Sequence, residues 1–258
     1  MSTGAAERPA AESVHASPPA PVSPGLAMLG MLIWPRATVR RLPTRGTAWL
    51  LPAGVIALLL VLPSLTVLRP LELEARAELL DRYADQGWLS AEEAHDAERR
   101  LAELGQTEPA AHVVAFQLAI GLLFQIAVRF LLPAWLLLAG ARFVLEAEVR
   151  YRELLSAVAF AAVPAGVREL ARTPLRLARG DLDVHFSPAA LAPAETFGAQ
   201  ALRCLDAFDL WIVGLLVLAV AATARLSYGR AAALVVPLWG AACLLRLGLS
   251  ATPIGGGL

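Results

Sequence analysis

Two long apolar segments separated by only six residues constrain this chain more than any other feature of its sequence. The first follows Asp206 and runs to Ala224, and the second runs from Ala231 to Leu245. About 20 apolar residues are needed for an α-helix to cross the hydrocarbon core of a bilayer. The short connection between the segments makes the two helices antiparallel neighbours. The chain is therefore predicted to be an integral membrane protein.

The composition agrees with this prediction. Of the 258 residues, 57% are hydrophobic and 17% are charged, whereas soluble domains are about 25% charged. The formal net charge is zero, so we expect no nucleic-acid partner. All 22 basic residues are arginine, and alanine, leucine and proline are abundant. This pattern is typical of a GC-rich bacterial genome and favours the bacterial inner (cell) membrane as the location.

The pattern of apolar runs predicts an all-α, polytopic membrane bundle of about five transmembrane helices. The third span is the weakest, because its uncharged part has only fourteen residues, from Leu154 to Val167, and contains Pro164. We keep it as a span that is bent or shallow. The predicted spans are residues 48–68, 112–139, 153–171, 207–225 and 230–249.

The segment between the first two spans predicts a soluble, acidic helical hairpin over residues 71–106, with helices at about 71–86 and 90–105. Residues 70–110 contain 11 of the 22 acidic residues and only four arginines, a net charge of −7. Gln86-Gly87 interrupts the helical spacing, and Ser90 and Glu93 have the spacing of a capping box at the start of the second helix. His95 beside Asp96 fits a solvated face better than a metal site.

The two ends of the chain are predicted to lie outside the membrane domain of residues 26–250. Residues 1–25 form a tail rich in proline and alanine that is expected to be disordered, and residues 251–258 form a Gly-rich tail. Leu26 to Trp34 is too short to span and leads into an arginine cluster between Arg36 and Arg45. This stretch is either a helix lying in the interface or a simple topological anchor.

Polar residues within the spans form a candidate intramembrane cluster. Gln117, Gln125 and Arg129 are separated by eight and four residues, which places them on one face of the second span. An arginine near mid-span costs about 2.5–3.5 kcal/mol on insertion scales, so it should face the bundle and find a partner. Glu169 and Asp209 are the candidates. Asp209 has a second interpretation, because it lies with Asp206 at a helix start, where carboxylates cap free amides.

Recognisable catalytic and cofactor motifs are missing from the sequence. There is no Gly-x-Ser-x-Gly, no His-Glu-x-x-His and no pair of intramembrane aspartates. The two cysteines, Cys204 and Cys243, do not form a disulfide framework or a zinc site and are interpreted as small buried residues. We therefore predict no catalytic residues, no cofactor and no metal.

Several segments together resemble one family of membrane proteins. The most specific is the stretch from Leu205 to Trp211, which contains Asp206, Phe208 and Asp209. The others are Trp34-Pro35-x-x-Thr38-Val39, the capping box at Ser90, Tyr151 to Pro164, and Leu226 to Ala231. Across residues 30–250 the chain resembles the Yip-type domain family, named for membrane proteins that interact with Ypt/Rab GTPases.

The resemblance implies five spanning helices with a cytoplasmic N-terminus, but no catalytic residues. Arginine counts on the two sides are nearly equal, ten inside and eleven outside. The early cluster from Arg36 to Arg45 favours the N-inside orientation, because charges flanking the first spans count most.

Three functions were compared. A non-enzymatic scaffold or adaptor that binds membrane lipids and other membrane proteins, or associates with itself, fits the family and the hairpin. A transporter or channel would use the polar face around Arg129. An intramembrane enzyme is the least supported of the three.

Overall fold

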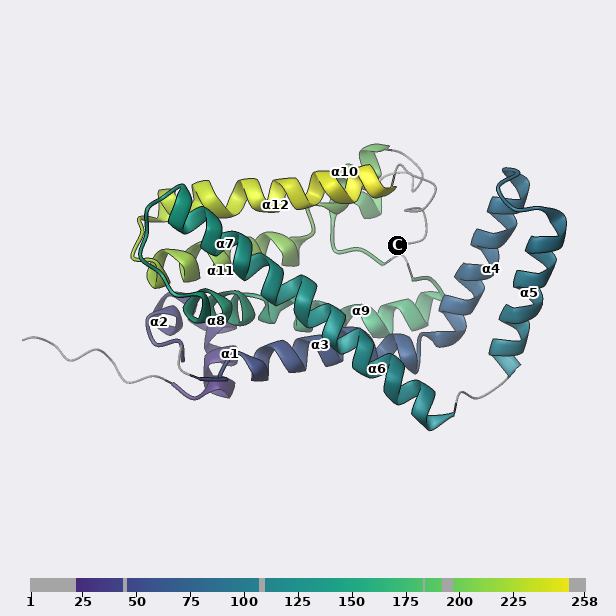
Figure 1. Ribbon diagram of the computed structural model, residues 1–258, viewed down its shortest axis with the longest axis horizontal. Coiled ribbons are helices and arrows are strands. Elements are labelled where there is room, and N and C mark those ends of the chain that lie inside the picture. Colours follow the sequence, from purple (N-terminus) through teal and green to yellow (C-terminus); the bar gives the residue numbers. More distant parts are fainter. Residues whose placement is uncertain (1–21, 44–45, 107–109, 183, 192–196, 251–258) are drawn as a thin grey trace, which may run out of the picture.

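The computed structural model describes residues 22–43, 46–106, 110–182, 184–191 and 197–250. Within these ranges the ordered elements are helices, without a strand, and the long ones run alternately in opposite directions along the molecule (Figure 1). The predicted all-α bundle is therefore confirmed. Both predicted tails lie largely outside the described residues, although helix α1 (Pro24–Ile33) begins within the predicted N-terminal one.

Three helical stretches are long and apolar enough to cross a membrane. They are α6 to α7 (Ala111–Phe143), α8 to α9 (Tyr151–Arg179) and most of α12 (Tyr228–Gly248 of Tyr228–Ser250). Helix α3 (Leu50–Leu65) adds a fourth only together with α4 (Arg69–Asp85), from which it is bent by 67°. Helix α11 (Ala207–Thr223) is a shorter apolar helix. Three to four spans are thus supported by length and composition, and five stays a prediction.

The third predicted span lies at the centre of the bundle. It consists of α8 (Tyr151–Ala161) and α9 (Val163–Arg179), and all but one of the residues from Leu154 to Gly166 are buried. Helix α8 packs against α11 and α7, and α9 packs against α3. The helical stretch is longer than predicted and is enclosed by the other helices. Its hydropathy is low because a helix that is surrounded by protein contacts little lipid and does not need an apolar surface.

The N-terminal motif forms a tight corner between α1 and α2 (Pro35–Val39). Ala27 and Met31 of α1 are fully buried in a cluster that includes residues of α8 and α11. The Thr38 hydroxyl donates to the Trp34 carbonyl at 2.9 Å. A Cβ at Gly30 would collide with the Thr38 hydroxyl, so the close approach of the two short helices requires glycine.

The acidic hairpin stands apart from the bundle, at the end where α12 finishes (Figure 1). It is formed by α4 and α5 (Ala91–Gln106), within two residues of the predicted helices. Gly87 in the turn has φ +72°, a conformation that favours glycine. The capping box is confirmed: the Ser90 amide donates to Glu93 Oε2 at 2.9 Å, and the Glu93 amide donates to Ser90 Oγ at 3.3 Å.

Candidate functional site

Charged side chains from three helices meet at the end of the bundle where α11 begins. The tightest contact joins Arg168 of α9 to Asp209 of α11, with Arg168 NH1 2.6 Å from Asp209 Oδ1. The same nitrogen lies 3.8 Å from Asp206 Oδ1. The Arg168 and Asp206 side chains are only 8% and 4% exposed. Because a buried charge is costly unless it is paired, the two carboxylates offset the cost of burying Arg168.

The other charges of α9 extend this cluster by helical spacing. Arg168, Arg172 and Arg176 recur every four residues and therefore lie on one face of α9. Arg172 NH2 lies 3.5 Å from Asp206 Oδ2, and Arg176 NH1 donates to Glu169 Oε1 at 2.9 Å. Sequence reasoning missed this arginine series, although its regular spacing was a usable signal.

The first residues of α11 explain the Leu205–Trp211 motif. Asp206 is the N-cap, and its Oδ1 accepts from the Phe208 amide at 2.9 Å. The Phe208 ring makes an edge contact with Phe186, centroid to centroid 5.3 Å, and stacks at 6.4 Å on Trp211. The Ala207 amide donates to the Phe186 carbonyl at 3.1 Å. The motif thus fixes a preceding loop against the start of α11 while its carboxylates hold α9.

Arg129 lies in a widened helical turn. Residues Ala127–Leu131 form a π-helical turn, η1, between α6 (Ala111–Ile126) and α7 (Leu132–Phe143). Pro133 has no N–H to donate to the Arg129 carbonyl, and the Leu132 amide instead bonds to the Ala127 carbonyl five residues back. Such turns are rare and frequently occur at functional sites. Arg129 Nε donates to Gln125 Oε1 at 2.7 Å.

The predicted polar cluster is only partly assembled. Gln125 and Arg129 are in contact, as their spacing predicts, but Gln117 is exposed, because only one side of α6 packs, against α3. Within the described ranges Arg129 forms no ion pair, and both predicted partners bind elsewhere: Asp209 with Arg168, and Glu169 with Arg176. Arg129 interacts electrostatically with these two carboxylates, and with Arg168 and Arg246, without direct contact. Asp209 lies in the first turn of α11, as its helix-start interpretation predicts, but the side chain that caps an amide is that of Asp206, and the arginine paired with Asp209 is Arg168.

We use the name arginine network for these groups together. Its last member, Arg246 of α12, lies with NH1 3.7 Å from Asp209 Oδ2 and is 65% exposed, so the network reaches the molecular surface there. The network consists of Arg129, Arg168, Arg172, Arg176 and Arg246 with Glu169, Asp206 and Asp209.

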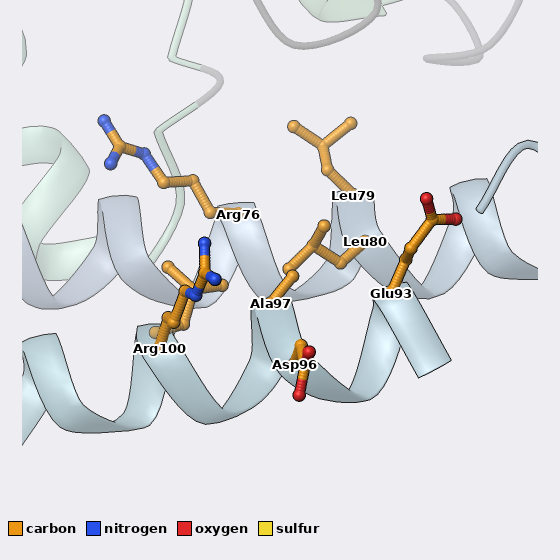
Figure 2. Close-up of a pocket in the computed structure, with 8 residues that line it drawn as sticks. Arg76, Leu79, Leu80, Glu93, Asp96, Ala97 and Arg100 are labelled. Carbon is orange, nitrogen blue, oxygen red and sulfur yellow. The ribbon is translucent and has the colours of Figure 1, made fainter. Parts of the chain in front are cut away.

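A second candidate site is an open groove between the two hairpin helices, with a volume of about 600 Å³. We call it the hairpin groove. Figure 2 shows two arginines at one end of the groove and one carboxylate, Glu93, at the other, with apolar side chains between them and a second carboxylate near the middle of α5. The arginines are Arg76 and Arg100, the carboxylates are Glu93 and Asp96, and the apolar residues are Leu79, Leu80, Ala97 and Leu101.

The whole helical region corresponds to one known family. The family model of the Yip1 domain matches residues 29–249, which is most of the chain. This protein belongs to the Yip1 domain family. The match includes the corner at Thr38, the hairpin, and the α9–α11 contacts of the arginine network, so both candidate sites lie inside the Yip1 domain. No curated protein and no solved structure matches the chain.

Membership and the apolar helices together make this a membrane protein of the Yip family. The resemblance inferred from the Leu205–Trp211 motif is therefore confirmed. The bacterial origin suggested by the arginine bias stays a prediction.

Proposed function

We propose that this Yip-family protein is a non-enzymatic scaffold that associates with itself through the hairpin groove and thereby organises membrane proteins or lipids around it. The observation that carries the proposal is the half-buried apolar floor of the hairpin groove. Proteins of this family are not known as enzymes, which agrees with the proposed role. The occupant to which we commit is the hairpin of a second copy.

The hairpin cannot bury its own apolar residues. Among its described side chains, Ala94 is the one that is buried; Leu79, Leu80 and Leu101 remain half exposed. Two helices form one contact layer, and their outer apolar faces need a second layer to cover them. Two hairpins packed face to face would make a four-helix bundle, the arrangement that usually satisfies this need.

The charges of the groove are complementary to themselves. Arg76 and Arg100 lie at one end, Glu93 lies at the other, and Asp96 lies between them on α5 (Figure 2). A two-fold axis across the groove turns the second copy end to end, so that the arginine end of each copy meets the acidic end of the other. Isologous contacts have this symmetry, and complementary charges fix the register of an interface.

Co-purification of two differently tagged copies from mild detergent tests the proposal. Wild-type copies should co-purify, whereas Arg76→Glu with Arg100→Glu in both copies should abolish the association. Arg82→Glu with Arg99→Glu makes the same charge change at exposed hairpin positions outside the groove and should leave it intact. A copy carrying Asp96→Arg should recover association with the Arg76/Arg100 variant.

Two results would contradict self-association. If tagged wild-type copies never co-purify, the groove does not dock a second copy. If other proteins co-purify instead and only the groove variant loses them, the groove is an adaptor surface for a different partner.

We further propose that the protein resides in the bacterial cell membrane with its N-terminus in the cytoplasm and its hairpin on the opposite side. The arginines between Arg36 and Arg45 support this orientation. In a Cys204→Ala, Cys243→Ala background, Gln86→Cys should react with an impermeant maleimide in intact cells. Ser227→Cys, in the α11–α12 loop, should react only after permeabilisation. The opposite pattern would reverse the topology.

A transporter or channel centred on Arg129 is the second candidate function. It is favoured by one observation, the absence of an ion pair at Arg129 in the part of the chain that the structure describes. Intramembrane ionisable groups often lie on substrate pathways. Solute flux into reconstituted vesicles that is lost in Arg129→Ala would support this candidate, and flux that survives the substitution would remove Arg129 from the pathway.

A further inference from the structure

We propose that the arginine network binds a phosphate group, either that of a phospholipid headgroup or free inorganic phosphate. The proposal is independent of the scaffold function, because the network lies on the turn η1, on α9 and α12 and at the start of α11, and shares no residue with the hairpin groove. Three properties of the network support it: its charge balance, its unsatisfied donors and its access to the surface.

The network has more positive than negative charge. Four of its arginines form ion pairs with its three carboxylates, and Arg129 forms none in the part of the chain that the structure describes, so the network has two more positive than negative charges. Asp206 and Asp209 each form ion pairs with two arginines. The longer of these distances are 3.8 Å from Asp206 Oδ1 to Arg168 NH1 and 3.7 Å from Asp209 Oδ2 to Arg246 NH1. Arg246 is 65% exposed and keeps contact with water, but a charge removed from water needs compensation, and a phosphate monoester or diester carries one to two negative charges that can supply it.

The network also has more hydrogen-bond donors than acceptors. Arg168 Nε, Arg172 Nε and the Thr173 hydroxyl are buried without a hydrogen-bond partner. Buried polar groups are almost always satisfied, so these atoms indicate a missing acceptor. Arg129 adds a guanidinium whose one described hydrogen bond, from Nε, goes to the neutral Gln125. Guanidinium groups bind phosphate oxygens through paired hydrogen bonds, and one phosphate offers several acceptor oxygens.

An anion can reach the network through Arg246. This side chain is 65% exposed and contacts Asp209, which in turn holds the buried Arg168. Together they connect the surface of α12 to the interior of α9. A lipid headgroup at the end of the bundle and a dissolved phosphate would both arrive by this route.

The binding test uses the full chain purified in a maltoside detergent, which contains no phosphate. Sodium phosphate, compared with sodium chloride at equal ionic strength, should raise the thermal unfolding temperature, since a ligand that binds only the folded state stabilises it. Native mass spectrometry after mixing with equal amounts of phosphatidylglycerol and a glucosyl-diacylglycerol distinguishes the sources. Retention of the phospholipid alone identifies a headgroup, and its displacement by inorganic phosphate shows that both use the same site.

Arg129→Gln is the decisive variant, because it removes a guanidinium that no carboxylate depends on. We expect it to weaken phosphate or phospholipid binding about tenfold, the effect of losing a charge-assisted hydrogen bond. Arg246→Gln, at an exposed position that tolerates substitution, should have an effect in the same direction. Arg142→Gln is the matched control on α7, where Arg142 donates to the Val149 carbonyl at 3.1 Å and belongs to no ion pair of the network.

Three outcomes would overturn the proposal. They are a folded wild-type protein that binds neither phosphate nor phosphatidylglycerol, an Arg129→Gln variant that binds as tightly as wild type, and an Arg142→Gln variant that is weakened equally. The Arg76→Glu, Arg100→Glu groove variant should bind phosphate normally, so failure of the scaffold function would leave this result unaffected.

Discussion

Removing the negative charge of Asp209 tests whether the contact between α9 and α11 stabilises the bundle. In Asp209→Asn, Arg168 loses a carboxylate at 2.6 Å and retains Asp206 at 3.8 Å, which it shares with Arg172. Breaking a fully buried ion pair costs about 3–5 kcal/mol. Because Asp206 remains and the Asp209 side chain is 17% exposed, we expect a smaller loss of about 2–3 kcal/mol in the free energy of unfolding.

A double-mutant cycle separates this pair from the rest of the network. Arg168→Met and Asp209→Asn, singly and together, should give a coupling energy of about 1.5–3 kcal/mol. A second cycle, between Arg129→Gln and Asp209→Asn, should give less than about 0.5 kcal/mol, because these side chains do not contact each other. The measurement is reversible unfolding in mixed detergent micelles at increasing fractions of a denaturing detergent.

Two outcomes would refute the argument. A coupling below about 0.5 kcal/mol for Arg168 and Asp209 would mean that the short contact contributes nothing beyond solvation. A larger coupling for Arg129 and Asp209 than for Arg168 and Asp209 would restore the pairing that the sequence suggested.

Three further predictions concern other parts of the fold. Gly30→Ala should destabilise the protein by about 1–3 kcal/mol through overpacking at the α1–α2 corner, whereas Gly54→Ala, with open space around it, should not; equal unfolding temperatures would contradict this. The hydrogen bonds from the Ser90 amide and then its hydroxyl lower the pKa of Glu93 below the ordinary value of a glutamate. The hairpin should therefore be stabilised at a pH above the ordinary glutamate pKa and lose this contribution as the pH falls through the lowered pKa. Hydrogen exchange should show a smaller acid-induced loss in Ser90→Ala, and an unchanged loss would contradict this. The Cys204 thiol lies 3.9 Å from the Cys243 carbonyl. Mild oxidation should therefore cross-link the two cysteines, and failure would argue against the contact between Cys204, which follows α10 (Phe197–Arg203), and α12.

Local chemistry predicted the hairpin well. Its helices begin and end within two residues of the predicted bounds because the signals that define them are local. Gly87 allows the left-handed turn, and Ser90 with Glu93 caps the next helix. Asp206 is also correctly predicted by a local signal, because its position at the start of a helix indicates a cap and its side chain accepts from the Phe208 amide. Interactions over three or four residues depend on the sequence alone, so they can be predicted from it.

Hydropathy was a poorer guide to depth in the bundle. The third span had the weakest apolar run and proved the most enclosed, with 78% of its most apolar window buried, against 17% for α6 to α7 and for α12. Hydropathy measures how well a segment tolerates lipid. A central helix contacts protein instead, so it can contain Arg168 and Glu169 and still be buried.

The partner of a buried charge could not be predicted for the same reason. Spacing correctly placed Gln125 one turn from Arg129, yet it could not show that Arg168 would be closer to Asp209. That choice depends on which faces of α9 and α11 meet, and on the wide turn that Pro133 imposes at Arg129. The consequence is chemical as well as structural. Because Arg168 pairs with Asp209, the carboxylate that the sequence suggested for Arg129, the Arg129 guanidinium has no ion pair among the residues that the structure describes. This excess positive charge favours the binding of an anion from outside the chain, which a network with equal numbers of opposite charges would not need.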